Sequence, residues 1–409
     1  MGEPGESRGA GDMAPPRLAR GALECPPRPC SPEAPLEIAL HEIEPWLIEY
    51  QFVRYNLAES GMVNQTVGQL LEATGGSPEE LLRQSFDNAD TRGSRALREA
   101  IAALYDGVEP EDVLVTTGTS EALFLYSHVR HRPGANVVVP TPAFQSLPEV
   151  PRYLGYEVRE LPLKIEQGFR LDLGALERLV DANTRTVVMN NPQNPTGVRL
   201  TDAEVSEVRR IASRVGAEVL ADEHYRFVPL DDDAQLIPSL YTPGGGTVAI
   251  GSMIKCMGCV GLRVGWMIGP KSLLDACRDL KDYTTHTLCS MNDYVATQAL
   301  RNWQPVMRLY RAWVKENVAA FTAFMARHAE VLGWVPPQGG LVAFPYLRDA
   351  SVASAQLSRR LVETREVFVL PGETFGRPGH FRVGFGLPPA RFAEALARWS
   401  DFLSERAWK

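Results

Sequence analysis

Short apolar runs alternate with helical segments through the middle of the chain. Each run has four or five residues and resembles a buried strand of a parallel sheet. We predict six such strands, at Val113–Thr116, Asn136–Val139, Glu157–Leu161, Thr186–Met189, Glu218–Ala221 and Thr247–Ile250. Helical spacing of apolar residues predicts helices at Ser120–Arg130, Leu173–Asp181 and Ala203–Val215. This alternation predicts an α/β fold whose large domain holds a mostly parallel sheet with helices on both faces.

The two ends of the chain are expected to form a smaller α+β domain. Near the N-terminus we predict a helix around Glu44–Tyr50, a glycine-punctuated loop at Ser60–Gly68, and helices at Ser77–Gln84 and Ser94–Tyr105. After a helical stretch at Met291–Leu332, we predict strands at Leu341–Phe344, Val367–Leu370 and Phe381–Phe385, and a helix from Ala390 to the end. The expected divisions are a disordered tail (1–36), an N-terminal segment joining the small domain (37–75), a large domain (76–305) and a small C-terminal domain (306–409).

Composition narrows the class of protein. The first 36 residues are rich in Pro, Gly and Arg and lack the apolar region of a secretory signal, which predicts a disordered tail. The chain has 409 residues and a net charge of −8, which argues against nucleic acid or an anionic membrane as the main partner. No apolar run approaches the length of a membrane span.

The six cysteines are sparse and lack the spacing of a disulfide scaffold, which indicates a reducing, cytoplasmic location. Cys256 and Cys259 form a C-x-x-C pair. Such a pair can be redox-active or half of a zinc site, but no second pair or nearby histidine ligand follows it. We therefore interpret the two as small packing residues and expect no metal.

Candidate chemistry gathers where the predicted strands end, which is where open α/β sheets bind ligands. Small residues after the first strand open a helix and suit an anion. Phe144 could stack on a planar ring, and Asn194 and Tyr225 could bond a ring oxygen. Asp222 could pair with a protonated ring nitrogen. The residues at this edge are Gly118, Thr119, Ser120, Phe144, Asn194, Asp222 and Tyr225.

One lysine, Lys255, follows the last predicted strand within the glycine-rich stretch 251–266. Its amine could form a Schiff base with a carbonyl cofactor, while Ser252 and Arg263 hold a phosphate. Each feature alone has an ordinary structural explanation, such as a helix cap, a turn or a solvated surface lysine. Together they supply an anion cradle, a stacking ring, an amide, a carboxylate and a lysine, which is what pyridoxal 5′-phosphate (PLP) needs.

Two motifs carry a family resemblance: Asn-Pro-Gln-Asn-Pro-Thr-Gly at 191–197, and Ser-x-x-Lys-x-x-Gly-x-x-Gly-x-Arg at 252–263. From about Trp46 onward the chain resembles fold type I PLP enzymes of the class I/II aminotransferase family. The resemblance implies that Lys255 carries the cofactor as an internal aldimine, that Asp222 contacts the pyridine nitrogen, and that Asn194 and Tyr225 contact the 3′-oxygen. It assigns the phosphate to Gly118, Thr119, Ser120, Ser252 and Arg263.

The late motif Phe-Arg-Val-Gly-Phe at 381–385 resembles the family's substrate-carboxylate site. Arg382 has the bidentate fork that this role needs, although a surface arginine on an edge strand is the alternative. Two positions depart from the pattern of many aminotransferases. Asn88 stands where they carry a tyrosine that reaches the partner subunit's phosphate, and Ile254 stands where serine is common before the lysine.

The resemblance implies an enzyme that forms an external aldimine and a quinonoid from an L-amino acid, and a homodimer with shared active sites. Shorter motifs, including Pro45-Trp46-Leu47 and Asp282-Tyr283, resemble a ring-closing enzyme of secondary metabolism within the family. We therefore expect β- or γ-elimination followed by addition or ring closure, on an arginine-derived or S-adenosylmethionine-like substrate. The alternatives are conventional transamination and, more remotely, a PLP-binding regulatory protein.

Overall fold

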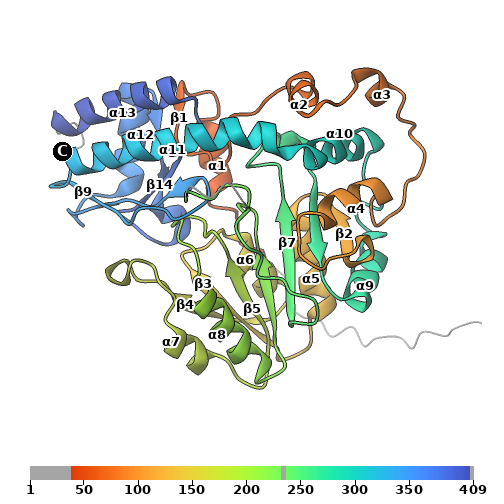
Figure 1. Ribbon diagram of the computed structural model, residues 1–409. Helices are drawn as coiled ribbons and strands as arrows, with labels where there is room; N and C mark the ends of the chain where they lie inside the picture. Colours follow the sequence, from red (N-terminus) through yellow and green to blue (C-terminus); the bar gives the residue numbers. More distant parts are fainter. Residues whose placement is uncertain (1–37, 232–235, 406–409) are drawn as a thin grey trace, which may run out of the picture. The chain divides into compact units, whose positions relative to one another are not determined.

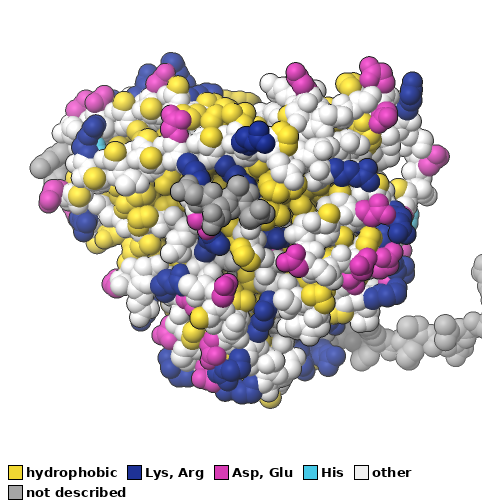
Figure 2. All heavy atoms as spheres, in the orientation of Figure 1, with side chains coloured by type: hydrophobic (Ala, Val, Ile, Leu, Met, Phe, Trp, Pro, Cys, Tyr) yellow, Lys and Arg dark blue, Asp and Glu magenta, His cyan; other side chains and the backbone are white. Residues whose placement is uncertain are grey.

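The computed structural model describes residues 38–231 and 236–405. The tail predicted over residues 1–36 lies outside the described residues. No helix within those ranges is long and apolar enough to cross a lipid bilayer. On the face drawn in Figure 2, basic and acidic side chains are interspersed.

A seven-stranded sheet holds the central part of the chain together (Figure 1). Its strands lie in the order β2-β8-β7-β6-β5-β3-β4, and only β8 runs antiparallel to its neighbours. Their bounds are β2 Val113–Thr116, β3 Asn136–Thr141, β4 Glu157–Pro162, β5 Thr184–Asn190, β6 Glu218–Asp222, β7 Thr247–Ser252 and β8 Gly265–Ile268. All six predicted strands are present, and the mostly parallel sheet is confirmed. β8 was not predicted, because two of its four residues belong to the glycine-rich stretch 251–266.

Helices cover both faces of this sheet, as predicted. In β6, Leu220 packs in one apolar cluster with residues of α5, while Val219 and Ala221 pack in another with residues of α8. This alternation is the two-residue period of a strand buried on both sides. The helices before and around the sheet are α2 Val67–Thr74, α3 Pro78–Leu82, α4 Arg95–Ala102, α5 Thr119–Arg130, α6 Ser146–Tyr153, α7 Leu173–Leu179, α8 Asp202–Ser213, α9 Lys271–Lys281 and α10 Ser290–Arg301.

The C-terminal part adds three small sheets and the helices α11, α12 and α13, drawn in blue tones in Figure 1. The strand β1, near the N-terminus, pairs in parallel with β12, so the two ends of the described chain share one sheet. Ile43, in α1, packs against apolar residues of this part. The bounds are α1 Ile43–Glu49, β1 Tyr55–Asn56, α11 Trp303–Arg327, β9 Leu332–Gly333, β10 Val342–Ala343, β11 Tyr346–Leu347, α12 Ser354–Arg365, β12 Val367–Phe368, β13 Leu370–Pro371, β14 Phe381–Gly384 and α13 Pro389–Ser404.

Local capping explains several helix starts. Thr66 and Gln69 form a reciprocal capping box at α2, so the helix begins at Val67 and the loop predicted over 60–68 is too long by two residues. Thr201 and Glu204 cap α8 in the same way. Four helices were not predicted: α2, α6, α9 and α12. α6 contains Pro151 in its interior, a residue that normally counts against a helix.

Candidate active site

A cavity of about 430 Å³, called here the central cavity, lies at the carboxyl ends of the central strands. Residues from both ends of the chain and from the sheet line it. The lining residues with polar or aromatic side chains are Glu44, Gln51, Glu59, Ser60, Thr119, Ser120, Phe144, Asn190, Asn194, Asp222, His224, Tyr225, Lys255, Arg263 and Arg382. Most residues predicted at the strand ends are therefore brought together in one cavity.

One wall of the cavity is the N-terminus of α5. Gly118 precedes the helix with a φ of 85°, and a Cβ there would lie 2.9 Å from Nη2 of Arg263. A Cβ on Gly265 would lie 2.6 Å from the carbonyl carbon of Gly118. The two glycines let the backbone and the Arg263 guanidinium approach closely. Free backbone N–H groups, the hydroxyls of Thr119 and Ser120, and one guanidinium make this wall suited to an anion.

One of the lining residues, Asp222, is a buried carboxylate. Asp222 ends β6, and its Oδ1 accepts a hydrogen bond of 3.2 Å from the backbone N–H of His224. Burial raises the pKa of Asp222 to about 7. Burial and the nearby Lys255 and Arg263 lower the pKa of His224 to about 3, so His224 is neutral. Since His224 offers no positive charge, a cation bound inside the cavity would stabilise the charged form of Asp222.

Asn194 and Tyr225 are also buried in the lining. The backbone N–H of Asn194 donates to Oδ1 of Asn190 over 2.6 Å, which fixes the turn after β5. The hydroxyl of Tyr225 donates to the carbonyl of Ser60 over 2.9 Å, and burial raises its pKa. The side chain of Tyr225 is thus held by the N-terminal segment, and Oδ1 of Asn194 accepts a hydrogen bond of 3.4 Å from Nη1 of Arg382.

Lys255 follows β7, the strand that ends beside β6 in the sheet. Burial lowers the pKa of Lys255, which favours the neutral, nucleophilic amine. Gly61 lies against it, and a Cβ at that glycine would be 3.1 Å from Cδ of the lysine. Ser252 is buried and does not line the cavity; its Oγ accepts a hydrogen bond of 3.1 Å from the backbone N–H of Ile254.

Arg382, on β14, is 1% exposed and lines the cavity from the C-terminal part of the chain. Its Nη2 donates to the carbonyl of Ala58 over 2.7 Å, and its Nη1 donates to Oδ1 of Asn194 over 3.4 Å. Its Nε is buried and has no hydrogen-bond partner in the described chain. The surface-arginine alternative is therefore wrong, because this guanidinium is buried inside the molecule and still has an unused hydrogen-bond donor.

Several lining residues were not predicted. His224 and Asn190 adjoin predicted positions, so the same strand ends could have indicated them. Glu44, Glu59 and Ser60 come from the N-terminal segment, where no strand end of the main sheet marks them.

The two departures from the family pattern lie in different places: Asn88 is exposed and outside the cavity lining, whereas Ile254 lines the cavity. Cys256 and Cys259 are buried, and burial raises the pKa of each thiol to about 12, so neither is a reactive thiolate.

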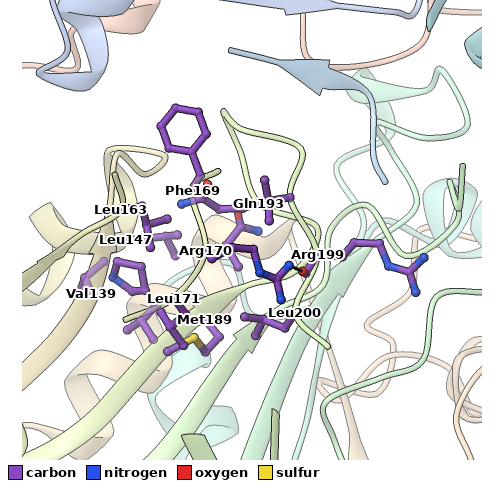
Figure 3. A pocket seen from close by; sticks show the side chains of 14 residues that line it. Val139, Leu147, Leu163, Phe169, Arg170, Leu171, Met189, Gln193, Arg199 and Leu200 are labelled. Atoms are coloured by element: carbon purple, nitrogen blue, oxygen red, sulfur yellow. Dashed lines mark hydrogen bonds between the residues drawn. The ribbon is translucent and has the colours of Figure 1, made fainter. Parts of the chain in front are cut away.

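A second, much smaller pocket of about 30 Å³ lies beside the central cavity (Figure 3). It is lined mainly by aliphatic side chains such as Val139, Leu163 and Met189, and it shares Asn190 with the central cavity. Its volume suits one or two water molecules rather than an amino acid. The central cavity is the candidate active site, because it is large enough for an amino acid and is lined by most of the residues predicted at the strand ends.

The fold and this cavity define a fold type I PLP enzyme. Residues 66–398 match the family described as aminotransferase class I and II, so the chain belongs to that family. It is 30% identical over 368 residues to capreomycidine synthase of Streptomyces vinaceus, covering 89% of this chain and 94% of that protein. A crystal structure of the PLP-dependent cyclase OrfR matches with a TM-score of 0.84 and 30% identity, covering 93% of this chain and all of that one.

A PLP-dependent aminotransferase of Streptococcus suis 89-1591 matches equally well in structure, with a TM-score of 0.84 and 27% identity over 90% of this chain and 98% of that one. These similarities show that the chain is a PLP-dependent enzyme, a transferase or a lyase. The residues present fit the cofactor: a Cβ would fill the glycine cradle at Gly118 and Gly265, and within residues 38–231 and 236–405 Asp222 forms no ion pair that would offset its burial.

Proposed function

We propose that the enzyme converts an L-amino acid by β- or γ-elimination followed by addition or ring closure, in secondary metabolism. The observation that supports this most is the similarity, along nearly the whole chain, to a capreomycidine synthase and to a PLP-dependent cyclase. On the same basis we propose a cationic substrate derived from arginine or resembling S-adenosylmethionine.

The proposed roles follow the chemistry of the cavity wall. Thr119, Ser120, Arg263 and the backbone at Gly118 would hold the cofactor phosphate, and Ser252 is added to this set from its motif alone, because its side chain does not line the cavity. Phe144 would stack on the cofactor ring, and Lys255 would hold the cofactor covalently. Asn194 and Tyr225 would bond the ring 3′-oxygen. When bound, PLP supplies an electron sink that stabilises negative charge on the substrate Cα.

Lys255 is proposed as the base that removes the Cα proton. Its burial lowers the pKa of the amine, so a larger fraction is unprotonated near neutral pH than for an exposed lysine. Asp222 would keep the ring nitrogen protonated, because a buried carboxylate whose pKa is raised to about 7 regains its charge beside a cation. Asp222 ends β6 and Lys255 follows the neighbouring strand β7, so the sheet brings the two groups to the same edge.

Arg382 is proposed to bind the substrate carboxylate. Its contacts with Ala58 and Asn194 hold the guanidinium plane. A fixed carboxylate orients the Cα–H bond and limits rotation of the substrate, which lowers the entropic part of the barrier. Asn194 would contribute to the same substrate site.

Conventional transamination is the second candidate, favoured by the equally good structural match to an aminotransferase. The two reactions separate when the holoenzyme is incubated with candidate amino acids in the absence of an oxo acid. Turnover with the starting absorbance of the cofactor retained supports elimination. Accumulation of the amino form of the cofactor in a single turnover contradicts it and supports transamination.

We further propose a homodimer with shared active sites in the cytoplasm. Leu82 and Phe86 are 84% and 86% exposed, and Tyr283 is 89% exposed, so large apolar surface is available for a partner. The described cysteines are free, which suits a reducing compartment. Light scattering should give twice the chain mass, and the F86D variant should shift this toward the monomer. A monomeric wild type would contradict the proposal.

A further inference from the structure

Two carboxylates in the central cavity have no role in the chemistry proposed above. Glu44 lies in the first turn of α1, and Glu59 lies in the segment after β1. Among residues 38–231 and 236–405, neither side chain has a hydrogen bond or an ion pair. Most other charged groups of the cavity have a proposed partner: Arg263 the phosphate, Asp222 the ring nitrogen and Arg382 the substrate carboxylate.

The position of Glu59 is fixed by its neighbours on both sides. The carbonyl of Ala58 accepts the 2.7 Å hydrogen bond from Arg382, and the carbonyl of Ser60 accepts the 2.9 Å bond from Tyr225. The backbone of Glu59 itself packs on β14, where a Cβ on Gly384 would fall 1.8 Å from the Glu59 carbonyl oxygen. Glu59 is therefore held between two residues of the proposed site.

Glu44 is placed by α1. The preceding residue, Ile43, is 1% exposed and anchors the helix in an apolar cluster. The backbone N–H of Glu42 donates to Oε1 of Gln145 over 2.8 Å, and Nε2 of the same glutamine donates to the carbonyl of Leu40 over 2.7 Å. Gln145 directly follows Phe144, another lining residue. The start of α1 is thus tied to the cavity wall.

The electrostatics place both carboxylates near the reacting groups. Burial lowers the pKa of Lys255, and Glu59 and Glu44 oppose that shift. Burial likewise lowers the pKa of Arg382, against Tyr225, Glu59 and Glu44. A separate observation also indicates a ligand at this end, since the buried Nε of Arg382 lacks a partner in the described chain. Glu44 and Glu59 add negative charge that neither the cofactor nor a substrate carboxylate would neutralise, and this charge favours binding of an additional cation.

We propose that Glu44 and Glu59 bind the positively charged side chain of the substrate, so that the enzyme selects amino acids bearing a guanidinium, ammonium or sulfonium group. Arg382 would take the carboxylate and the two glutamates the side chain, which orients the substrate from both ends. The inference rests on the proposed function in one respect, namely that an amino acid occupies this cavity. It holds for elimination and transamination alike, because it concerns recognition.

Pairs of amino acids that differ mainly in charge test the proposal. The cofactor-loaded full chain is titrated with arginine and citrulline, lysine and norleucine, and S-adenosylmethionine and S-adenosylhomocysteine, while the cofactor absorbance reports binding. We expect the cationic member of at least one pair to bind about 10- to 100-fold more tightly, the range typical of a hydrogen bond to a charged group. The preference should shrink about tenfold or more in E44Q and in E59Q, and disappear in the double variant.

E49Q is the matched control, because Glu49 lies on the same helix but pairs with Arg359 outside the cavity lining. It should keep the wild-type preference. Equal or tighter binding of the neutral members by wild type, or an unchanged preference in the double variant, would overturn the proposal. Failure of the proposed function has a different signature: no covalent cofactor adduct on Lys255 after borohydride reduction of the wild type.

Discussion

The two ends of the central cavity are built in different ways. At the cofactor end, Gly118 follows β2, Asp222 ends β6 and Lys255 follows β7, so strands of one sheet position all three residues. At the substrate end, Arg382 lies on β14, while Glu44 and Glu59 come from a segment more than 300 residues earlier in the chain. One end is made by sheet topology and the other by long-range packing.

This difference has a consequence for how each end responds to change. The cofactor end rests on a sheet buried on both faces, so its geometry should survive substitution of single polar side chains. The substrate end depends on a few hydrogen bonds, such as those that Ala58 and Ser60 accept from Arg382 and Tyr225. We expect changes at the first end to affect cofactor chemistry and changes at the second to affect substrate binding.

The largest effect is expected at Lys255. Replacement by Ala removes both the covalent attachment and the proposed base, and activity should fall by about 10⁴-fold or more. After borohydride reduction, peptide mass spectrometry should find the cofactor adduct on Lys255 in wild type and none in K255A. K281A is a useful control, since Lys281 is another buried lysine but lies outside the cavity lining. An adduct that persists in K255A would refute the assignment of the cofactor end.

The sequence predicted the cofactor end of the cavity better than the substrate end. Strands β2, β6 and β7 were predicted from apolar runs, and the residues after them could be placed at one edge because parallel strands share an edge. Glu44 and Glu59 could not be placed at the site in this way, because no local sequence pattern indicates that β1 pairs with β12 or that Tyr225 bonds to Ser60. Arg382 was found only through its motif. Its burial depends on contacts with Ala58 and Asn194, which lie far away in the sequence.

Asp222 should give the next largest effect. The D222N variant keeps the shape but loses the charge that would hold the ring nitrogen protonated, and kcat should fall about 10²- to 10³-fold, as for loss of one preorganised electrostatic group. D222E is the matched control and should retain more activity. Normal activity in D222N would show that the carboxylate is structural.

The same residue predicts a pH effect on the cofactor-free protein. An unfolded aspartate titrates near pH 3.9, whereas burial raises the pKa of Asp222 to about 7 in the folded state. Between these values the folded state holds a proton that the unfolded state has lost, so stability falls as pH rises. From pH 5 to pH 8, urea unfolding should show wild type losing about 2–3 kcal/mol more than D222N. A parallel dependence in both proteins would contradict the buried, uncompensated carboxylate.

A substitution at Arg382 tests the substrate end alone. R382K keeps the charge but loses the planar fork, so kcat/KM should fall about 10²-fold, mainly through a higher KM. The absorbance of the bound cofactor and its dissociation constant should stay at wild-type values, because Arg382 acts on the substrate. R377K is a control on a nearby arginine outside the cavity lining. Loss of cofactor binding in R382K would show that the two ends are not separable.

The smallest expected effect comes from the glycine that opens α5. In G118A the added Cβ would lie 2.9 Å from Nη2 of Arg263, and the φ of 85° is unfavourable for alanine. G134A separates these two contributions, because Gly134 has a φ of 74° and open space around its Cβ position. Both variants should lose about 1 kcal/mol of stability from the backbone conformation. Only G118A should also bind the cofactor about tenfold more weakly, measured by equilibrium dialysis, because the cradle between α5 and Arg263 is narrowed there. If G134A weakened cofactor binding as much, the effect would be one of general stability, and the close approach of Arg263 to α5 would have no part in holding the phosphate.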